Sequence, residues 1–255
     1  MDRPFILISN DDGYHSGGIR YLVEFLNDMA DILVCAPDGG RSGYSRAFSA
    51  VPPLYLKRCE NILDAEVWSC SGTPVDCVKI ALDQLTPHRT PSLIIGGINH
   101  GDNSTVNNHY SGTMGVAIEG CLKYIPSIAF STCDYNPSAD LSAMRDYVRK
   151  ITSKVLVEGL PKGICLNVNF PQGDHFQGVK VCRMGYGSWI NEVVRNVHPR
   201  GYTYYWMAGD YRDDEPDATD NDRWALAHQY IAVTPTKIDV TSYEMLSKMK
   251  DWESL

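Results

Sequence analysis

The sequence lacks three features that define large classes of protein. None of its apolar runs approaches the length of a membrane span, so we expect no transmembrane segment and no membrane partner. Lys and Arg number 23 against 31 Asp and Glu, and the net charge of −8 argues against sequence-independent nucleic-acid binding, which needs a basic surface. The eight cysteines include no Cys-x-x-Cys pair, and most lie in apolar stretches. We therefore expect buried thiols in a reducing cytoplasm rather than a disulfide framework or a zinc site.

Several catalytic signatures are missing as well. The sequence contains no Gly-x-Ser-x-Gly, no cysteine-nucleophile motif and no Gly-x-x-x-x-Gly-Lys-Ser/Thr. The stretch Gly13–Gly18 only loosely echoes a dinucleotide fingerprint, and the two carboxylates before it would repel a pyrophosphate unless a metal intervened, which disfavours a dehydrogenase. The first apolar run follows Met1–Pro4 without a basic segment or a signal-length apolar run, which predicts a cytoplasmic protein.

The first half of the chain repeats a short apolar run, a polar loop and an amphipathic helix. Strands are expected at 5–8, 31–36, 65–70, 93–95 and 128–130, and helices at about 19–26, 74–85 and 114–124. This order predicts an α/β fold with a parallel sheet and right-handed crossovers. The polar loops that follow the strands should therefore gather at one edge of the sheet.

The second half has a different pattern. We expect a helix at about 139–158, strands at 164–169, 178–183, 202–207 and 230–233, a solvated acidic loop from Asp210 to Asp222, and a terminal helix at 241–253. No linker separates the halves, so residues 1–255 are expected to form one domain, with a core over about 1–135 and an extension over about 136–255. The aromatic-rich tail is equally consistent with completing the core and with packing on a second subunit.

The most informative feature is Asp11-Asp12-Gly13, directly after the first strand. Open α/β sheets bind ligands at the carboxyl ends of their strands, and two adjacent carboxylates there favour a bound cation. Ser42 and Asn99 follow two other strands, so four oxygen donors should converge, a set that suits Mg²⁺ or Mn²⁺ better than zinc. The alternative is an Asp-Gly turn with solvated charges.

A second candidate element is Ser111-Gly112-Thr113, at the start of a predicted helix. Free amides and the positive end of the helix dipole make such a start an anion site, although an N-cap without a ligand is the commoner case. The loop 39–43 supplies Arg41 and glycine amides such as that of Gly43, which could touch phosphate or form a flexible turn. Three histidines, His15, His100 and His109, are either proton donors to a leaving group or packed side chains.

These motifs together resemble the SurE survival-protein family of metal-dependent nucleotidases. The matching stretches are 8–13, 36–38, 41–43, 72–77, 97–103, 110–113, 119–120, 167–169, 205–206 and 234–235. They occur in fixed order over nearly the whole chain. Thr105 and Gln229 stand where the family pattern has Gly, and Gly40, Gly96 and Asn107 also depart from it without removing a metal ligand.

The resemblance implies a Rossmann-like three-layer core with a C-terminal β-rich extension that completes the sheet and builds homodimers or homotetramers by exchanging C-terminal segments. It implies a 5′-nucleotidase, a phosphoric monoester hydrolase that also acts on nucleoside 3′-monophosphates and short polyphosphate. It implies one divalent ion per subunit, Mg²⁺ or Mn²⁺, on Asp11, Asp12, Ser42 and Asn99.

We assign catalysis to Asp11 and Asp12, one of which would orient or deprotonate the attacking water. Phosphate contacts are assigned to Asn10, Gly43, Asn103, Ser111, Gly112 and Thr113. A non-catalytic metal-dependent sensor of nucleotide or phosphate would use the same residues, so the sequence leaves it open as an alternative.

Overall fold

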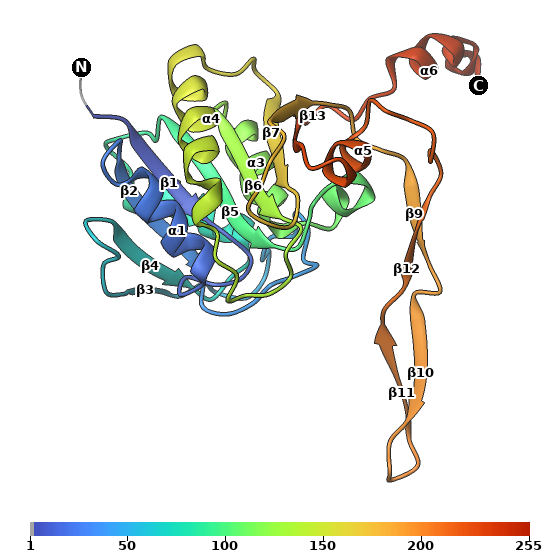
Figure 1. Cartoon of the computed structure of the whole chain (residues 1–255), viewed down its shortest axis with the longest axis horizontal. Coiled ribbons are helices and arrows are strands. Elements are labelled where there is room, and N and C mark those ends of the chain that lie inside the picture. The colour runs from blue at the N-terminus through green and yellow to red at the C-terminus, as the bar shows by residue number, and fades with distance from the viewer. Residues whose placement is uncertain (1–2) are drawn as a thin grey trace.

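Nine strands form one mixed sheet through the body of the molecule (Figure 1). The computed structural model describes residues 3–255. Six strands are parallel and lie in the order β4 (Glu66–Cys70), β2 (Asp31–Pro37), β1 (Phe5–Ser9), β5 (Leu93–His100), β6 (Ser127–Thr132) and β7 (Ile164–Phe170). The expected α/β fold with a parallel core is confirmed.

Three further strands run against the parallel set. The short strand β3 (Leu56–Arg58) pairs antiparallel with β4 at one edge of the sheet. At the other edge β13 (Ile231–Lys237) pairs antiparallel with β7, and β8 (Val179–Val181) lies parallel to β13. The second half of the chain therefore extends the sheet, as expected, but it reverses the strand direction where it does so.

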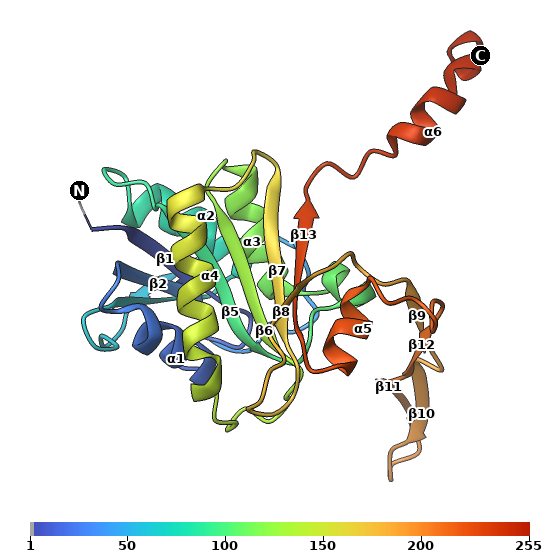
Figure 2. The same ribbon diagram turned by 45° about the horizontal axis from the view of Figure 1, so that its top comes forward.

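Helices cover both faces of the sheet and make three layers (Figure 2). Alternate residues of β1 point to opposite faces. Ile6 and Ile8 pack with α1 (Gly17–Leu26) and α4 (Arg145–Glu158), whereas Leu7 packs with α2 (Pro74–Ile80) and α3 (Gly112–Leu122). A strand that is buried on both sides is continuously apolar, which is why residues 5–8 carry no alternating pattern.

The starts of two helices are fixed by side-chain caps. Ser16 caps α1, since its hydroxyl accepts a hydrogen bond from the amide of Ile19. Thr73 and Asp76 form a reciprocal capping box at α2, with Pro74 as the first helical residue. Beyond Ile80 the helix continues as a π-helical turn, Ala81–Leu85. The predicted end at Leu85 is therefore right, but the last turn is not α-helical.

A two-stranded arm projects from the body (Figures 1 and 2). Its base pairs β9 (Gly187–Ile190) with β12 (Asp210–Asp213), and its outer part pairs β10 (Val193–Val197) with β11 (Thr203–Met207). The chain returns through α5 (Asp222–Ala227), enters the sheet as β13, and ends in α6 (Tyr243–Lys248) and a short 3₁₀ turn at Lys250–Ser254.

The expectation of a solvated acidic loop from Asp210 to Asp222 is wrong at both ends. Residues 210–213 form β12, because their backbone pairs with β9. Asp222 is fully buried and begins α5, because two backbone amides from other segments converge on its carboxylate.

The helix that the sequence predicts from residue 139 starts later, at Arg145, after a 3₁₀ turn at Ser142–Met144. Within residues 3–255 no helix combines the length and apolar character needed to cross a bilayer.

Candidate active site

The turn after β1 is closed by the side chain of Asn10. Its Oδ1 accepts from the Gly13 amide at 3.1 Å, and its Nδ2 donates to the Gly13 carbonyl at 3.2 Å and to Oγ of Ser16 at 2.7 Å. Gly13 has a φ of +107°, a conformation that glycine adopts without strain. These bonds hold Asp11 and Asp12 at the carboxyl end of β1. Asn10 is thus occupied within the protein, and its role as a phosphate contact stays a prediction.

Asp11 is buried against the first turn of α3. Thr113 Oγ1 donates to Asp11 Oδ1 at 2.5 Å, and a Cβ on Gly112 would lie 2.7 Å from the Cβ of Asp11. Glycine is therefore required at 112 for this close approach. Burial raises the pKa of Asp11 to about 6, while hydrogen bonds from Thr113 and the Gly112 backbone act in the opposite direction. A carboxyl group perturbed in this way is typical of functional sites.

Asp12 offers a buried oxygen without a partner. Its Oδ2 is inaccessible to solvent and makes no hydrogen bond with any of residues 3–255. Burial raises the pKa of Asp12, and a hydrogen bond from the backbone of His100 lowers it. An unpaired buried carboxylate oxygen is costly, and a cation next to it would remove that cost. The residues present therefore fit a hard divalent cation, whose preferred ligands are oxygens.

The structure brings the other two predicted ligands to the same rim. The amide of Arg41 donates to the backbone carbonyl of Asp11 at 2.7 Å, which places the exposed Ser42 one residue from that contact. Asn99 is 9% exposed, and its Nδ2 donates to the Gly101 carbonyl at 2.6 Å, which leaves Oδ1 without a partner among the described residues. The residues that carry these four oxygens thus follow three neighbouring strands at one edge of the sheet, and the convergence of their side chains on a single ion stays a prediction.

The remaining predicted phosphate contacts fall into two groups. Ser111 caps α3 by accepting from the Met114 amide at 2.9 Å, so its hydroxyl serves the helix while the amides of the first turn lie beside Asp11. Gly43 has a φ of +78° and open space around it. The hydroxyls of Ser111 and Thr113 and the amide of Gly112 are thus occupied within the protein, whereas the space around Gly43 is open, and the contact of these residues with phosphate stays a prediction.

Asn103 lies in a buried amide network instead. Its Nδ2 donates to Ser131 at 2.7 Å, its backbone amide donates to Asn169 at 2.8 Å, and its carbonyl accepts from Asn167 at 2.8 Å. Ser131 of β6 thus fixes the side chain of Asn103, and two asparagines of β7 fix its backbone. The sequence carries one signal for this network, the alternating Asn167 and Asn169 in an otherwise apolar strand. Buried side-chain amides need hydrogen-bond partners, so two of them in one buried strand indicate a network.

The three candidate histidines differ in their surroundings. Both ring nitrogens of His100 are buried and have no partner within residues 3–255, and burial lowers the pKa of this histidine. His15 and His109 are exposed. His100 is therefore the histidine of the rim itself, and it would be neutral at pH 7.

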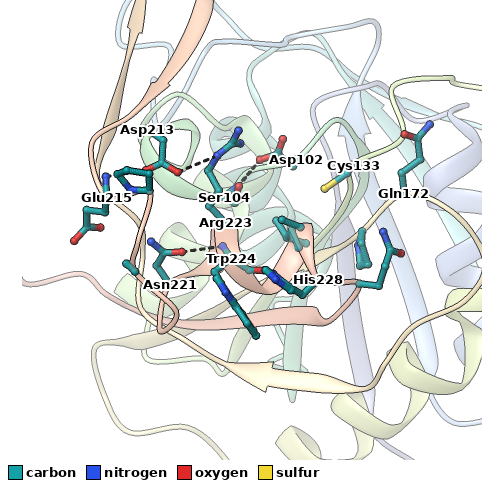
Figure 3. Close-up of a pocket in the computed structure, with 16 residues that line it drawn as sticks. Asp102, Ser104, Cys133, Gln172, Asp213, Glu215, Asn221, Arg223, Trp224 and His228 are labelled. Carbon is teal, nitrogen blue, oxygen red and sulfur yellow. Dashed lines mark hydrogen bonds and ion pairs between the residues drawn. The ribbon is translucent and has the colours of Figure 1, made fainter.

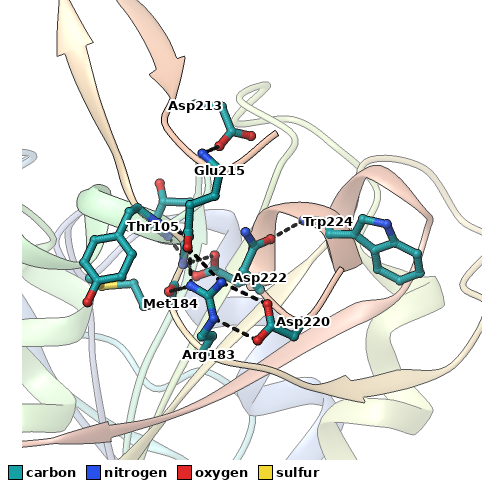
Figure 4. A network of polar contacts seen from close by, with 11 residues as sticks. Thr105, Arg183, Met184, Asp213, Glu215, Asp220, Asp222 and Trp224 are labelled. Atoms are coloured by element: carbon teal, nitrogen blue, oxygen red, sulfur yellow. Dashed lines mark hydrogen bonds and ion pairs between the residues drawn. The ribbon is translucent and has the colours of Figure 1, made fainter. Parts of the chain in front are cut away.

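The base of the arm is tied to the loop that follows β5 by a buried carboxylate that the sequence pattern does not reveal. Asp222 accepts from the amides of Thr105 at 2.8 Å and Gly185 at 2.9 Å, and Figure 4 shows it among the polar contacts around Arg183. Thr105 has a φ of +49°, and Gln229 has one of +61°. The two positions where the family pattern has Gly thus keep the left-handed backbone with a side chain present.

A separate cavity of about 460 Å³ opens beside α5 (Figure 3). None of the residues assigned from sequence to catalysis, metal or phosphate lines it. Its aromatic surface is engaged by the protein, since Trp224 stacks on His228 at 3.9 Å. Two of its three carboxylates, Asp213 and Glu215, are paired with arginines. This cavity is distinct from the rim that carries the predicted site.

The fold and the rim define an open α/β protein with an oxygen-rich site at the carboxyl ends of its parallel strands. The family model for Survival protein SurE matches residues 6–191, and the chain belongs to this family. It is 53% identical over 251 residues to a protein of Phocaeicola vulgatus named 5′-nucleotidase SurE, with 98% of this chain and 97% of that protein covered. A Bacteroides fragilis protein with the same name is 47% identical, with 98% of each chain covered.

A solved structure agrees with this family assignment. The crystal structure of the SurE protein from Aquifex aeolicus matches with a TM-score of 0.84 at 33% identity, covering 98% of this chain and 100% of the other. Because the match includes nearly the whole chain, this solved structure has the same α/β fold as the chain described here.

Proposed function

We propose that this chain is a metal-dependent phosphomonoesterase that hydrolyses nucleoside 5′-monophosphates to nucleoside and phosphate. The observation that carries the proposal is the pair Asp11 and Asp12, of which one is buried against the N-terminal turn of α3 and the other keeps a buried oxygen unpaired. A cation subsite and an anion subsite thus lie side by side. The names of the relatives support the nucleotide as substrate.

Asp11, Asp12, Ser42 and Asn99 would hold the ion. When bound, a divalent ion of this kind supplies neutralisation of phosphate charge and a water of lowered pKa. Asp12 or Asp11 orients the attacking water and accepts its proton. The amide of Gly112 already bonds to Asp11, so the amides of Ser111 and Thr113 would hold the phosphate oxygens, where the helix dipole favours negative charge.

The finer properties follow from the family resemblance. The chain would also hydrolyse nucleoside 3′-monophosphates and short polyphosphate, use Mg²⁺ or Mn²⁺, and work in the cytoplasm as a homodimer or homotetramer. Tyr44 is 52% exposed, and the amide of the next residue, Ser45, donates to the carbonyl of Tyr110 directly before the phosphate-binding turn. We therefore propose Tyr44 as the side chain that stacks on the base.

The test is phosphate release by the purified protein from AMP, GMP and a generic aryl phosphate. Mg²⁺ or Mn²⁺ is supplied first, and EDTA is added afterwards. Release that EDTA abolishes supports the enzyme. Saturable nucleotide binding without release would instead support the alternative from the sequence, a metal-dependent sensor, and would overturn the proposed activity.

A further inference from the structure

A groove of about 470 Å³ lies between α1 and the β3–β4 edge of the sheet, on the face that α1 covers. Its lining includes Tyr14, His15, Arg20, Lys57, Arg58 and Glu60. It is as large as the cavity beside α5, but it combines three cationic side chains with a single carboxylate. Such a balance is unusual in a chain whose net charge is −8.

One end of the groove adjoins the candidate active site. Tyr14 and His15 follow Asp12-Gly13 directly, and the amide of Tyr14 donates to the Pro37 carbonyl at 2.9 Å. A Cβ on Gly13 would lie 3.5 Å from Cε1 of His15, so the imidazole packs against the catalytic turn itself. His15 therefore joins the groove to the turn that carries the Asp pair.

Two of the three cations are free to act on a ligand. Arg58 is held in place, because it pairs with Glu66 at 3.3 Å and donates to Asn61 at 2.7 Å, so it builds the wall. Arg20 and Lys57 are exposed and make no ion pair within residues 3–255. Two unpaired cations in one concave surface attract phosphate groups.

The nearby carboxylates do not form ion pairs with these two cations. Glu60 lines the groove, and Glu24 lies one turn from Arg20 along α1. Neither forms an ion pair with Arg20 or Lys57. The three cations and the three carboxylates Glu24, Glu60 and Glu66 balance in charge, so what sets Arg20 and Lys57 apart is that neither side chain is engaged and both can turn toward a bound phosphate.

We propose that this groove binds a second phosphate group, carried by a substrate whose first phosphate lies at Asp11 and Asp12. The inference deepens the proposed phosphomonoesterase function and rests on it. A nucleoside bisphosphate and an inorganic phosphate chain both carry a second phosphate group that the groove could bind. The experiment below distinguishes these two ligands. Arg20 and Lys57 determine specificity for the second phosphate and take no part in the hydrolysis step.

The experiment compares Arg20→Gln/Lys57→Gln with the matched double variant Lys123→Gln/Lys150→Gln. The control removes two exposed cations outside the groove, so both variants change the net charge equally. Values of kcat/KM are measured for AMP, adenosine 3′,5′-bisphosphate and inorganic tripolyphosphate. We expect the groove variant to lose about tenfold on at least one of the two-phosphate substrates, to keep its rate on AMP within about twofold, and to show a weaker dependence on salt.

The outcomes that test the groove differ from the outcome that tests the proposed function. A loss confined to the bisphosphate assigns the groove to a nucleotide, and a loss confined to tripolyphosphate assigns it to a phosphate chain. Equal losses on AMP, or no loss on any substrate, overturn the inference. If the unmodified protein hydrolyses none of them, the proposed function fails. Calorimetric binding of tripolyphosphate and the bisphosphate in EDTA then decides the groove alone, since binding that the groove variant retains would overturn it.

Discussion

The body and the arm of this molecule differ in where their apolar side chains lie. In the body, Ile6, Leu7 and Ile8 of β1 are fully buried between two helical layers. On the arm, Trp206 and Met207 of β11 are 62% and 75% exposed. The body has a core of its own, whereas the arm is a two-stranded ribbon, and such ribbons are at best marginally stable alone.

This difference separates two tasks along one chain. All ten residues assigned from sequence to catalysis, metal or phosphate lie before Met114, in the body, and none lies on the arm. The arm instead presents an exposed apolar strip on one face, formed by Val194 opposite Trp206 and by Tyr204 beside Trp206. Exposed apolar strips of this kind mark interaction surfaces, which supports the proposed homo-oligomer.

The largest effect is expected from Asp11→Asn in the body. It removes the charge of the buried carboxylate but keeps its shape, so hydrolysis of AMP should fall by about 10³-fold or more while the melting temperature changes little. Initial rates and thermal unfolding measure the two quantities. Asp210→Asn, on the arm, is the control and should keep full activity. Full activity of Asp11→Asn with metal present would reject the site assignment.

The next effect concerns the arm. Replacing residues 193–207 with Asn-Gly should convert the proposed oligomer to a monomer and leave the body folded, because the apolar strip is removed. The backbone can accept this change, since the Ala208 amide already donates to the Glu192 carbonyl at 2.8 Å, as a two-residue turn requires. Light scattering gives the mass. Tyr124→Ser, which removes an exposed aromatic from the body, should leave the mass unchanged. An oligomer that survives without the arm would contradict the proposed role.

A third prediction addresses the junction between the two regions. Asp222→Ala leaves the buried amides of Thr105 and Gly185 without an acceptor, so the free energy of unfolding should fall by about 2–4 kcal/mol. Denaturant unfolding measures it. Asp217→Ala, in the exposed part of the same acidic run, should stay within about 0.5 kcal/mol of the unmodified protein. Equal effects of the two changes would show that the junction does not depend on Asp222.

The smallest effect is a pH dependence at the base of the arm. Arg183 lowers the pKa of Glu215 from its usual 4.5 to about 2. Because the folded-state pKa is the lower one, the contribution to stability is complete above about pH 4.5 and is lost as the pH falls toward 2. Glu215→Gln should therefore lower the melting temperature by about 1–2 °C at pH 7, and the difference should shrink below pH 4. Glu192→Gln is the control. A difference that grows on acidification would contradict this account.

Sequence patterns predicted the body far better than the arm. Continuous apolar runs such as 5–8 and 93–95 have one stable environment, the middle of a covered sheet, so both fold and rim follow from them. Residues 210–213 look polar and solvated, and they form a strand because β9 lies opposite. That pairing joins segments that are distant in sequence, and no local pattern encodes it.

Within the site, the sequence predicted which residues lie at the rim but not which groups they contact. Aspartates after a buried strand indicate a carboxyl-edge site, and Asp11 lies there. The sequence gives no sign that Thr113 and Gly112 would be the groups packed against Asp11, because that contact depends on how closely α3 approaches β1. Asn103 illustrates the same limit, since its partners Asn167 and Asn169 come from a strand much later in the chain.

The position of β13 between β7 and β8 has a consequence for how the protein is made. Synthesis proceeds from the N-terminus, so β8 emerges before the strand beside which it will lie, and the whole arm is made in between. During that interval the nascent sheet stops at β7 with an open edge, which can pair with other extended chains. The length of the arm therefore sets how long a ribosome-bound chain is exposed to mispairing.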